Sequence, residues 1–208
     1  MIGYYNYTVI LTYMSLVSSV LGMFLAVGFG GNQPHPDFAI VCLMVSGLCD
    51  MFDGKIARTK KDRTENEKKF GIQIDSLCDV VCFGVLPTVI GFSVGATKWW
   101  QLVIAGLFTL CGLIRLGYYN VTEETRQRTT DKKREAYTGL PITASALLMP
   151  ALLAFSKPLG PALPYAYTAL QFVVGLCYIT PLSVKKPGKI GMLIMLILGW
   201  VVIFSYIL

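Results

Sequence analysis

The chain has 208 residues, of which 54% are hydrophobic and 14% are charged, and its formal net charge is +6. Ordinary soluble domains carry about 25% charged residues, so this composition excludes a typical water-soluble domain. Because the apolar residues gather in long runs, the sequence predicts a protein embedded in a membrane.

Seven apolar stretches follow one another along the chain, separated by polar or glycine- and proline-containing breaks. Most of them approach the roughly 20 residues that a helix needs to cross the hydrocarbon layer. They predict an all-α, polytopic transmembrane helix bundle that forms a single domain over residues 1–208. The stretches are residues 9–29, 38–58, 70–94, 99–118, 140–156, 163–182 and 190–208.

Basic residues are concentrated in alternate breaks between these stretches. Residues 60–69, 126–134 and 185–189 hold most of them, whereas the opposite breaks hold only Lys98 and Lys157. By the positive-inside rule the basic side faces the cytoplasm. Topology and anionic lipid headgroups then account for the net charge, and no nucleic-acid partner is expected.

The cysteines and the single histidine do not indicate a soft metal site. All six cysteines fall within apolar stretches, where they act as small hydrophobic residues, and His35 lies in a loop between two prolines. This pattern disfavours a disulfide framework, a His/Cys metal site and a histidine general base.

Four aspartates interrupt the apolar stretches: Asp50, Asp53, Asp75 and Asp79. A charge at the centre of a membrane helix costs about 2.5–3.5 kcal/mol even on lenient scales. The i, i+3 and i, i+4 spacings place each pair on one helix face. Both pairs lie near the cytoplasmic ends of neighbouring stretches, so we expect the faces to meet and to bind hard cations such as Mg²⁺ or Mn²⁺. Helix capping or pairing with lysines would explain one such aspartate but not four.

Small and basic residues accompany the aspartates. Gly54 and Ala57 share the face of Asp53, and their bare backbone can admit a flat ligand such as a nucleobase. Arg58 adds a fork of donors suited to phosphate. Gly71 lies one turn before Asp75 and can open the same space. Together these residues predict a nucleoside-diphosphate site at a membrane surface.

The combined pattern, Asp50-x2-Asp53-Gly54-x2-Ala57-Arg58 followed by Gly71-x3-Asp75-x3-Asp79, resembles the signature of the CDP-alcohol phosphotransferases. These are membrane enzymes of lipid synthesis. The twelve residues at positions 59–70 exceed the usual spacing by about four, roughly one helical turn. The added turn need not rotate the second acidic face away from the first.

Three further runs, residues 70–87, 115–121 and 137–142, together with Thr12, resemble the bacterial and archaeal phosphatidylserine synthases within this family. The resemblance implies transfer of a phosphatidyl group from CDP-diacylglycerol to L-serine, with release of CMP. It also implies a six-helix core with an additional C-terminal span. The protein would be a homodimer in the prokaryotic cell membrane, with its active site facing the cytoplasm.

The resemblance assigns a role to each residue of the signature. Asp50, Asp53 and Asp75 would bind two divalent ions, Mg²⁺ or Mn²⁺, and Asp79 would be both a metal ligand and the general base. The CDP site would consist of the small and basic residues Gly54, Ala57, Arg58 and Gly71.

A serine or phosphate site is expected beyond the signature. Arg115 would contact a phosphate or the serine carboxylate, or would instead snorkel to the membrane interface. The other candidates for binding serine are Asn120, Tyr137 and Thr138.

Two rival functions fit part of the pattern. Phosphatidylglycerophosphate synthases use glycerol 3-phosphate as acceptor, which calls for more basic residues than Arg58 and Arg115. An ion-coupled transporter would explain buried aspartates. It would not explain Gly54, Ala57 and Arg58 beside them, and the sequence lacks the two matching halves of many transporters.

Overall fold

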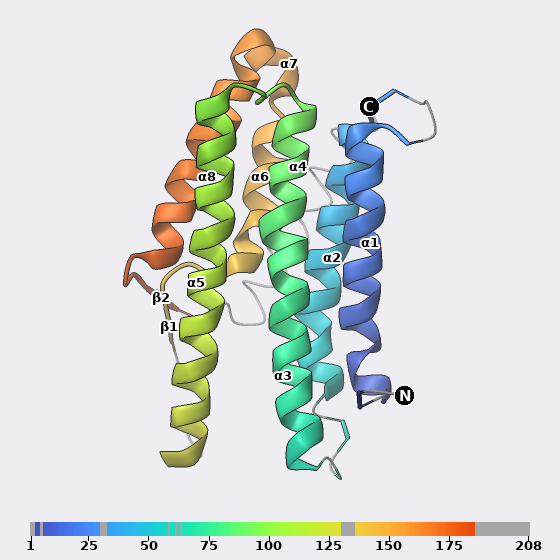
Figure 1. The fold of residues 1–208 in the computed structure, drawn as a ribbon, viewed down its shortest axis with the longest axis vertical. Helices are drawn as coiled ribbons and strands as arrows, with labels where there is room; N and C mark the ends of the chain where they lie inside the picture. Colours follow the sequence, from blue (N-terminus) through green and yellow to red (C-terminus); the bar gives the residue numbers. More distant parts are fainter. Residues whose placement is uncertain are drawn as a thin grey trace.

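The structure, a computed structural model, describes residues 3–4, 6–29, 33–57, 59–60, 62, 64–129 and 136–185. Its long helices run side by side along the long axis of the molecule (Figure 1). The α-helices are α1 (Ile10–Val27), α2 (Pro36–Ala57), α3 (Glu65–Asp79), α4 (Leu86–Ser93), α5 (Trp99–Thr129), α6 (Ser145–Leu153), α7 (Ser156–Leu159) and α8 (Leu163–Ile179). The short elements are η1 (Tyr7–Val9), η2 (Val80–Val85), η3 (Ile142–Ala144), η4 (Gly160–Ala162), β1 (Ala136–Thr138) and β2 (Ser183–Lys185).

The predicted all-α, polytopic membrane bundle is confirmed. Four described segments are long and apolar enough to cross a membrane: Tyr7–Val27, Glu65–Ser93, Trp99–Thr125 and Ser156–Ile179. Helix α2 has 22 residues, about 33 Å, which is long enough to cross, but its acidic residues lower its hydropathy. The apolar helix Ile142–Leu153 is shorter than the stretch predicted there. The seventh predicted stretch, residues 190–208, lies outside the described residues.

Two helices extend further than their apolar stretches predicted. Helix α3 begins at Glu65, so the second half of the expected loop at residues 60–69 is helical. Helix α5 continues to Thr129 and is about 46 Å long, because no glycine or proline follows Gly117 within it. Both extensions are polar.

The connections predicted to be basic and those predicted to hold few charges lie at opposite ends of the bundle. The N-terminus, the α2–α3 connection and the C-terminal end of α5 lie at one end, and the α4–α5 connection and α7 at the other (Figure 1). At the second end, Lys98 donates a hydrogen bond to the Tyr165 hydroxyl at 2.7 Å, and Trp100 stacks on the same ring. Trp99 beside them is 77% exposed. Such aromatic clusters are typical of a membrane–water interface.

A wide helical turn follows Asp79 and is explained by Pro87. Proline has no N–H, and its ring clashes with the carbonyl four residues earlier. The chain responds with the π-helix η2, in which the Leu86 N–H bonds to the Val81 carbonyl. In a regular α-helix the Phe83 carbonyl would accept a hydrogen bond from the N–H of residue 87, which Pro87 lacks. It accepts one of 3.0 Å from the Ser145 hydroxyl on α6 instead. The helix therefore continues into α4 without an unsatisfied carbonyl at this position.

A two-stranded antiparallel ribbon is a small departure from an all-α structure. Strands β1 and β2 pair with Tyr137 opposite Val184. The turn after β1 requires Gly139, whose φ is +82° and whose added Cβ would lie 2.8 Å from the Tyr178 carbonyl oxygen. Arg115 holds this turn by donating hydrogen bonds to the carbonyls of Leu140 at 3.2 Å and Gly139 at 3.5 Å.

Candidate metal and nucleotide site

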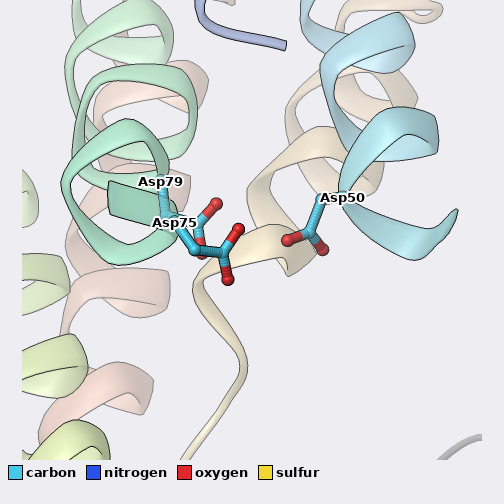
Figure 2. A group of neighbouring side chains, drawn as sticks. All are labelled: Asp50, Asp75 and Asp79. Atoms are coloured by element: carbon cyan, nitrogen blue, oxygen red, sulfur yellow. The ribbon is translucent and has the colours of Figure 1, made fainter. Parts of the chain in front are cut away.

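Three of the four predicted aspartates converge between α2 and α3. Asp50 on α2 and Asp75 and Asp79 on α3 each offer a carboxylate oxygen, and these oxygens lie within 4.8 Å of one another. Figure 2 shows the three side chains pointing into the same space from the two helices. The i, i+4 spacing on α3 and the facing position on α2 produce this cluster.

Asp53 lies beside the cluster, deeper between the helices. It is 9% exposed, which makes it less exposed than the three clustered aspartates. The Thr12 hydroxyl on α1 donates to Asp53 Oδ2 at 3.5 Å. Asp53 is therefore held by the first helix, and it does not belong to the group of three oxygens within 4.8 Å of one another.

The charges of these aspartates require compensation. Two unit charges 4.8 Å apart repel each other by about 3 kcal/mol at an effective dielectric constant of about 20. The donor set consists only of carboxylate oxygens, which suits hard divalent ions and not the softer ions that prefer cysteine or histidine. The residues present thus fit a divalent-metal centre.

The small residues of the signature leave space beside the aspartates. A Cβ added at Gly54 would meet no atom within 4 Å, so the backbone there faces an open region. Ala57 ends α2, and Gly71 is half-buried two turns before Asp79 on α3. Arg58, the predicted phosphate-binding residue, lies outside the described residues. The described part of the signature is therefore open on the α2 side, where a nucleotide is expected.

Helix α1 fixes the position of α2 behind the site. The Ser19 and Ser46 hydroxyls are 2.8 Å apart, and Ser46 donates to the Ser15 carbonyl at 3.0 Å. Ser15 also contacts the Cys82 sulfur on η2 at 3.4 Å. These small side chains let the three segments approach closely while satisfying their buried hydroxyls. The acidic faces of α2 and α3 are thus supported from behind by one helix.

The residues predicted for serine occupy two different places. Asn120 on α5 bonds to Ser76 on α3, with the amide nitrogen donating at 2.9 Å. The Ser76 hydroxyl is in turn 3.1 Å from the Asn120 amide oxygen. Arg115 is 7% exposed and turns toward the Gly139–Leu140 turn, so it does not snorkel to the membrane surface. Tyr137 and Thr138 lie in β1.

Sequence reasoning missed two residues that join the helix carrying Asp75 and Asp79 to other segments. Ser76 follows Asp75 and joins α3 to α5, and no local pattern singles it out. Glu67 accepts hydrogen bonds from Lys60, Asn6 and Thr64. The capping-box spacing of Thr64 and Glu67 was the signal that could have identified it.

An apolar groove runs along α1 and α2 toward the acidic cluster. Its volume is about 440 Å³, and its walls include Met14, Val17, Leu21 and Val45. Cys49, the neighbour of Asp50 in the chain, lines the same groove. The groove therefore reaches the level of Asp50 along α2, although no aspartate is among its lining residues.

Comparisons with known proteins agree with the signature. The family model described as CDP-alcohol phosphatidyltransferase matches residues 5–207. A CDP-diacylglycerol–serine O-phosphatidyltransferase of Saccharomyces cerevisiae is 34% identical over 57% of this chain and 42% of its own length. The protein of that name from Methanocaldococcus jannaschii is 30% identical over 74% of this chain and 66% of its own. An archaetidylserine synthase of Methanothermobacter thermautotrophicus is 32% identical over 52% of this chain and 43% of its own. Each match spans less than two thirds of the relative's length.

Proposed function

This chain belongs to the CDP-alcohol phosphatidyltransferase family, and from that premise we propose that it transfers a phosphatidyl group from a CDP-activated lipid to L-serine. The products are the phosphatidylserine-type lipid and CMP. The observation that carries this proposal is the convergence of Asp50, Asp75 and Asp79 at the end of a membrane bundle. The runs that resemble serine-using members and the names of the relatives support the choice of serine.

The reaction is a direct displacement in which Asp79 is the general base. A neutral serine hydroxyl is a poor nucleophile, so a carboxylate must accept its proton as the oxygen attacks. A bond forms between the serine oxygen and the lipid-bearing phosphorus. The bond from that phosphorus to the bridging oxygen breaks, and CMP departs with the electron pair. No covalent bond to the protein is needed.

Asp50, Asp53, Asp75 and Asp79 would hold two divalent ions, Mg²⁺ or Mn²⁺. Bound metal would offset charge on the phosphate oxygens and favour an in-line arrangement of the attacking and leaving groups. The position of Asp79, with a carboxylate oxygen within 4.8 Å of those of Asp50 and Asp75, supports its double assignment as ligand and base. Thr12 keeps Asp53 oriented through its hydrogen bond.

The CDP group would lie over the α2 side of the site. The open space at Gly54 supports close approach of a flat ring to the backbone, and Ala57, Gly71 and Arg58 complete the proposed pocket. An acyl or isoprenoid chain of the lipid would occupy the apolar groove along α1 and α2, whose end at Cys49 adjoins Asp50.

Serine binding is assigned to the polar residues at the same end of the bundle. We retain Arg115, Asn120, Tyr137 and Thr138 as candidates for this pocket. The hydrogen bonds of Arg115 and Asn120 to neighbouring segments support a role in which they shape the pocket as well as line it.

The site is proposed to face the cytoplasm of a prokaryotic cell, where serine and CDP-activated lipids are both available. The basic end of the bundle supports this orientation. We also propose a homodimer, the assembly that the resemblance implies.

The test is to give purified protein radiolabelled serine or glycerol 3-phosphate, with either CDP-diacylglycerol or its archaeal ether counterpart, and to identify the lipid product. We expect metal-dependent transfer to serine. Transfer of the phosphatidyl group mainly to glycerol 3-phosphate would refute serine as the acceptor, but it would not contradict the family or the metal site. Absence of lipid product, combined with ion-driven uptake in vesicles, would favour a transporter.

A further inference from the structure

Helices α2 and α3 carry the aspartates but make few direct contacts with each other, since both pack on α1. Their separation at the site is therefore not set by a shared packed interface. Repulsion between the carboxylates favours a wider spacing, so the site needs a connection that holds the two helix ends together.

Glu67, in the first turn of α3, provides a connection of this kind. Its Oε1 accepts hydrogen bonds from the Lys60 ammonium at 2.8 Å and the Asn6 amide at 3.3 Å. Its Oε2 accepts from the Thr64 backbone N–H at 2.8 Å and the Thr64 hydroxyl at 3.1 Å. A carboxylate has about four acceptor positions, so these donors engage both oxygens fully.

These donors come from different parts of the chain. Lys60 and Thr64 belong to the connection that follows α2, and Asn6 caps η1 at the start of the first membrane helix. Two further contacts reinforce the same junction: the Tyr7 hydroxyl lies 3.1 Å from the Thr59 hydroxyl, and the Tyr4 and Phe70 rings pack with centroids 5.6 Å apart. The junction is thus built from the N-terminal segment, the α2–α3 connection and α3.

We propose that Glu67 is a positioning residue for the metal centre, which holds α3 at the distance from α2 that lets Asp75 and Asp79 meet Asp50. This inference rests on the proposed metal site and extends it to a residue outside the signature. Helix α3 runs unbroken from Glu65 to Asp79, so a shift at its first turn is carried to both aspartates. The twelve residues between the two halves of the signature, residues 59–70, include Glu67 and its partners Lys60 and Thr64.

Glu65 is the matched control, because it lies in the same helical turn and also pairs with a lysine. Its partner Lys68 is on the same helix, 2.8 Å away, and the two side chains are 77% and 50% exposed. Glu67 and Lys60 are 16% and 27% exposed. An exposed pair within one helix contributes little and fixes no other segment, so Glu65→Ala should leave the metal site unchanged.

The experiment measures Mn²⁺ affinity by electron paramagnetic resonance on the full chain in detergent, together with the Mn²⁺ concentration for half-maximal activity. Glu67→Ala is expected to weaken Mn²⁺ binding by about 3- to 30-fold, the range for coupling through a rigid element. Turnover at saturating metal should stay within about twofold, since the reacting groups are intact. Glu67→Gln should show a smaller loss, because an amide offers one acceptor oxygen in place of two.

A purely structural role would lower the melting temperature of the metal-free protein without changing Mn²⁺ affinity, and that result overturns the inference. If Glu67→Ala does not fold, Glu67→Gln and Lys60→Met each remove only part of the junction, and unchanged affinity in both also overturns it. Wild-type protein that binds Mn²⁺ but does not use serine would refute the proposed acceptor alone. Wild-type protein that binds no Mn²⁺ would refute the metal site, and the inference with it.

Discussion

Asn120 on α5 and Ser76 on α3 are joined by side-chain contacts of 2.9 and 3.1 Å, one residue away from Asp75. The pair links the long helix α5 to the helix that supplies two of the clustered carboxylates. Because Ser76 precedes Asp79 by three residues on the same helix, this contact restrains the rotation of the acidic face. Asn120 therefore contacts the helix that carries Asp75 and Asp79, at the residue after Asp75.

We predict that Asn120→Ala and Ser76→Ala have non-additive effects. Each substitution breaks the same contact, so the double variant should lose little more stability than either single variant. The expected coupling is about 0.5–3 kcal/mol, measured by a double-mutant cycle of unfolding in detergent. Thr122→Ala is the control, because its hydroxyl bonds only to Tyr118 and Tyr119 of its own helix among the contacts described. Strictly additive losses would contradict the link.

Removal of metal should abolish lipid transfer, and Mg²⁺ or Mn²⁺ should restore it. We further predict that Asp75→Asn removes metal-dependent thermal stabilisation but raises the melting temperature of the metal-free protein, because one of the repelling charges is gone. Differential scanning fluorimetry with and without Mn²⁺ measures both effects. Asp37→Asn, an exposed position at the opposite end of α2, is the control: it should keep the metal-dependent stabilisation and should not raise the melting temperature of the metal-free protein. Full activity after rigorous chelation would refute the metal centre.

Asp79→Asn should separate binding from turnover. The amide keeps the shape of the side chain but cannot accept the serine proton, so turnover should fall by about 10²–10⁴-fold. CDP-lipid binding, measured by calorimetry at saturating Mn²⁺, should change much less, because the other three aspartates and the proposed nucleotide pocket remain. Near-normal turnover would assign the base to another residue, with Asp75 the first candidate.

Gly139→Ala should destabilise the junction between β1 and η3. The residue has φ of +82°, and the new Cβ would lie 2.8 Å from the Tyr178 carbonyl oxygen and 3.2 Å from Arg115 Nε. Backbone strain of this kind costs about 1–3 kcal/mol. Thermal unfolding in detergent provides the measurement. Gly106→Ala is the control on α5, since its Cβ would meet no atom within 4 Å; it should be neutral or slightly stabilising. Equal melting temperatures for the two variants would contradict this account of the turn.

The sequence alone determined the class of fold and the identity of the acidic faces. Hydropathy, helical spacing and the distribution of lysine and arginine are local properties, so they predicted the helical stretches, the different ends of the bundle and the pairing of Asp75 with Asp79. The signature also identified the family. These predictions required no knowledge of how distant segments pack.

Only the tertiary structure decided which carboxylates meet and what supports them. It placed Asp50 with the α3 aspartates and showed that the Thr12 hydroxyl of α1 orients Asp53 beside them. It also turned Arg115 inward to the Gly139 turn. The contacts of Asn120 and Glu67 likewise join residues 44 and 61 positions away in the chain. Such contacts depend on the rotation and separation of whole helices, which are set by packing against α1 and α5 and leave no periodic trace in the sequence.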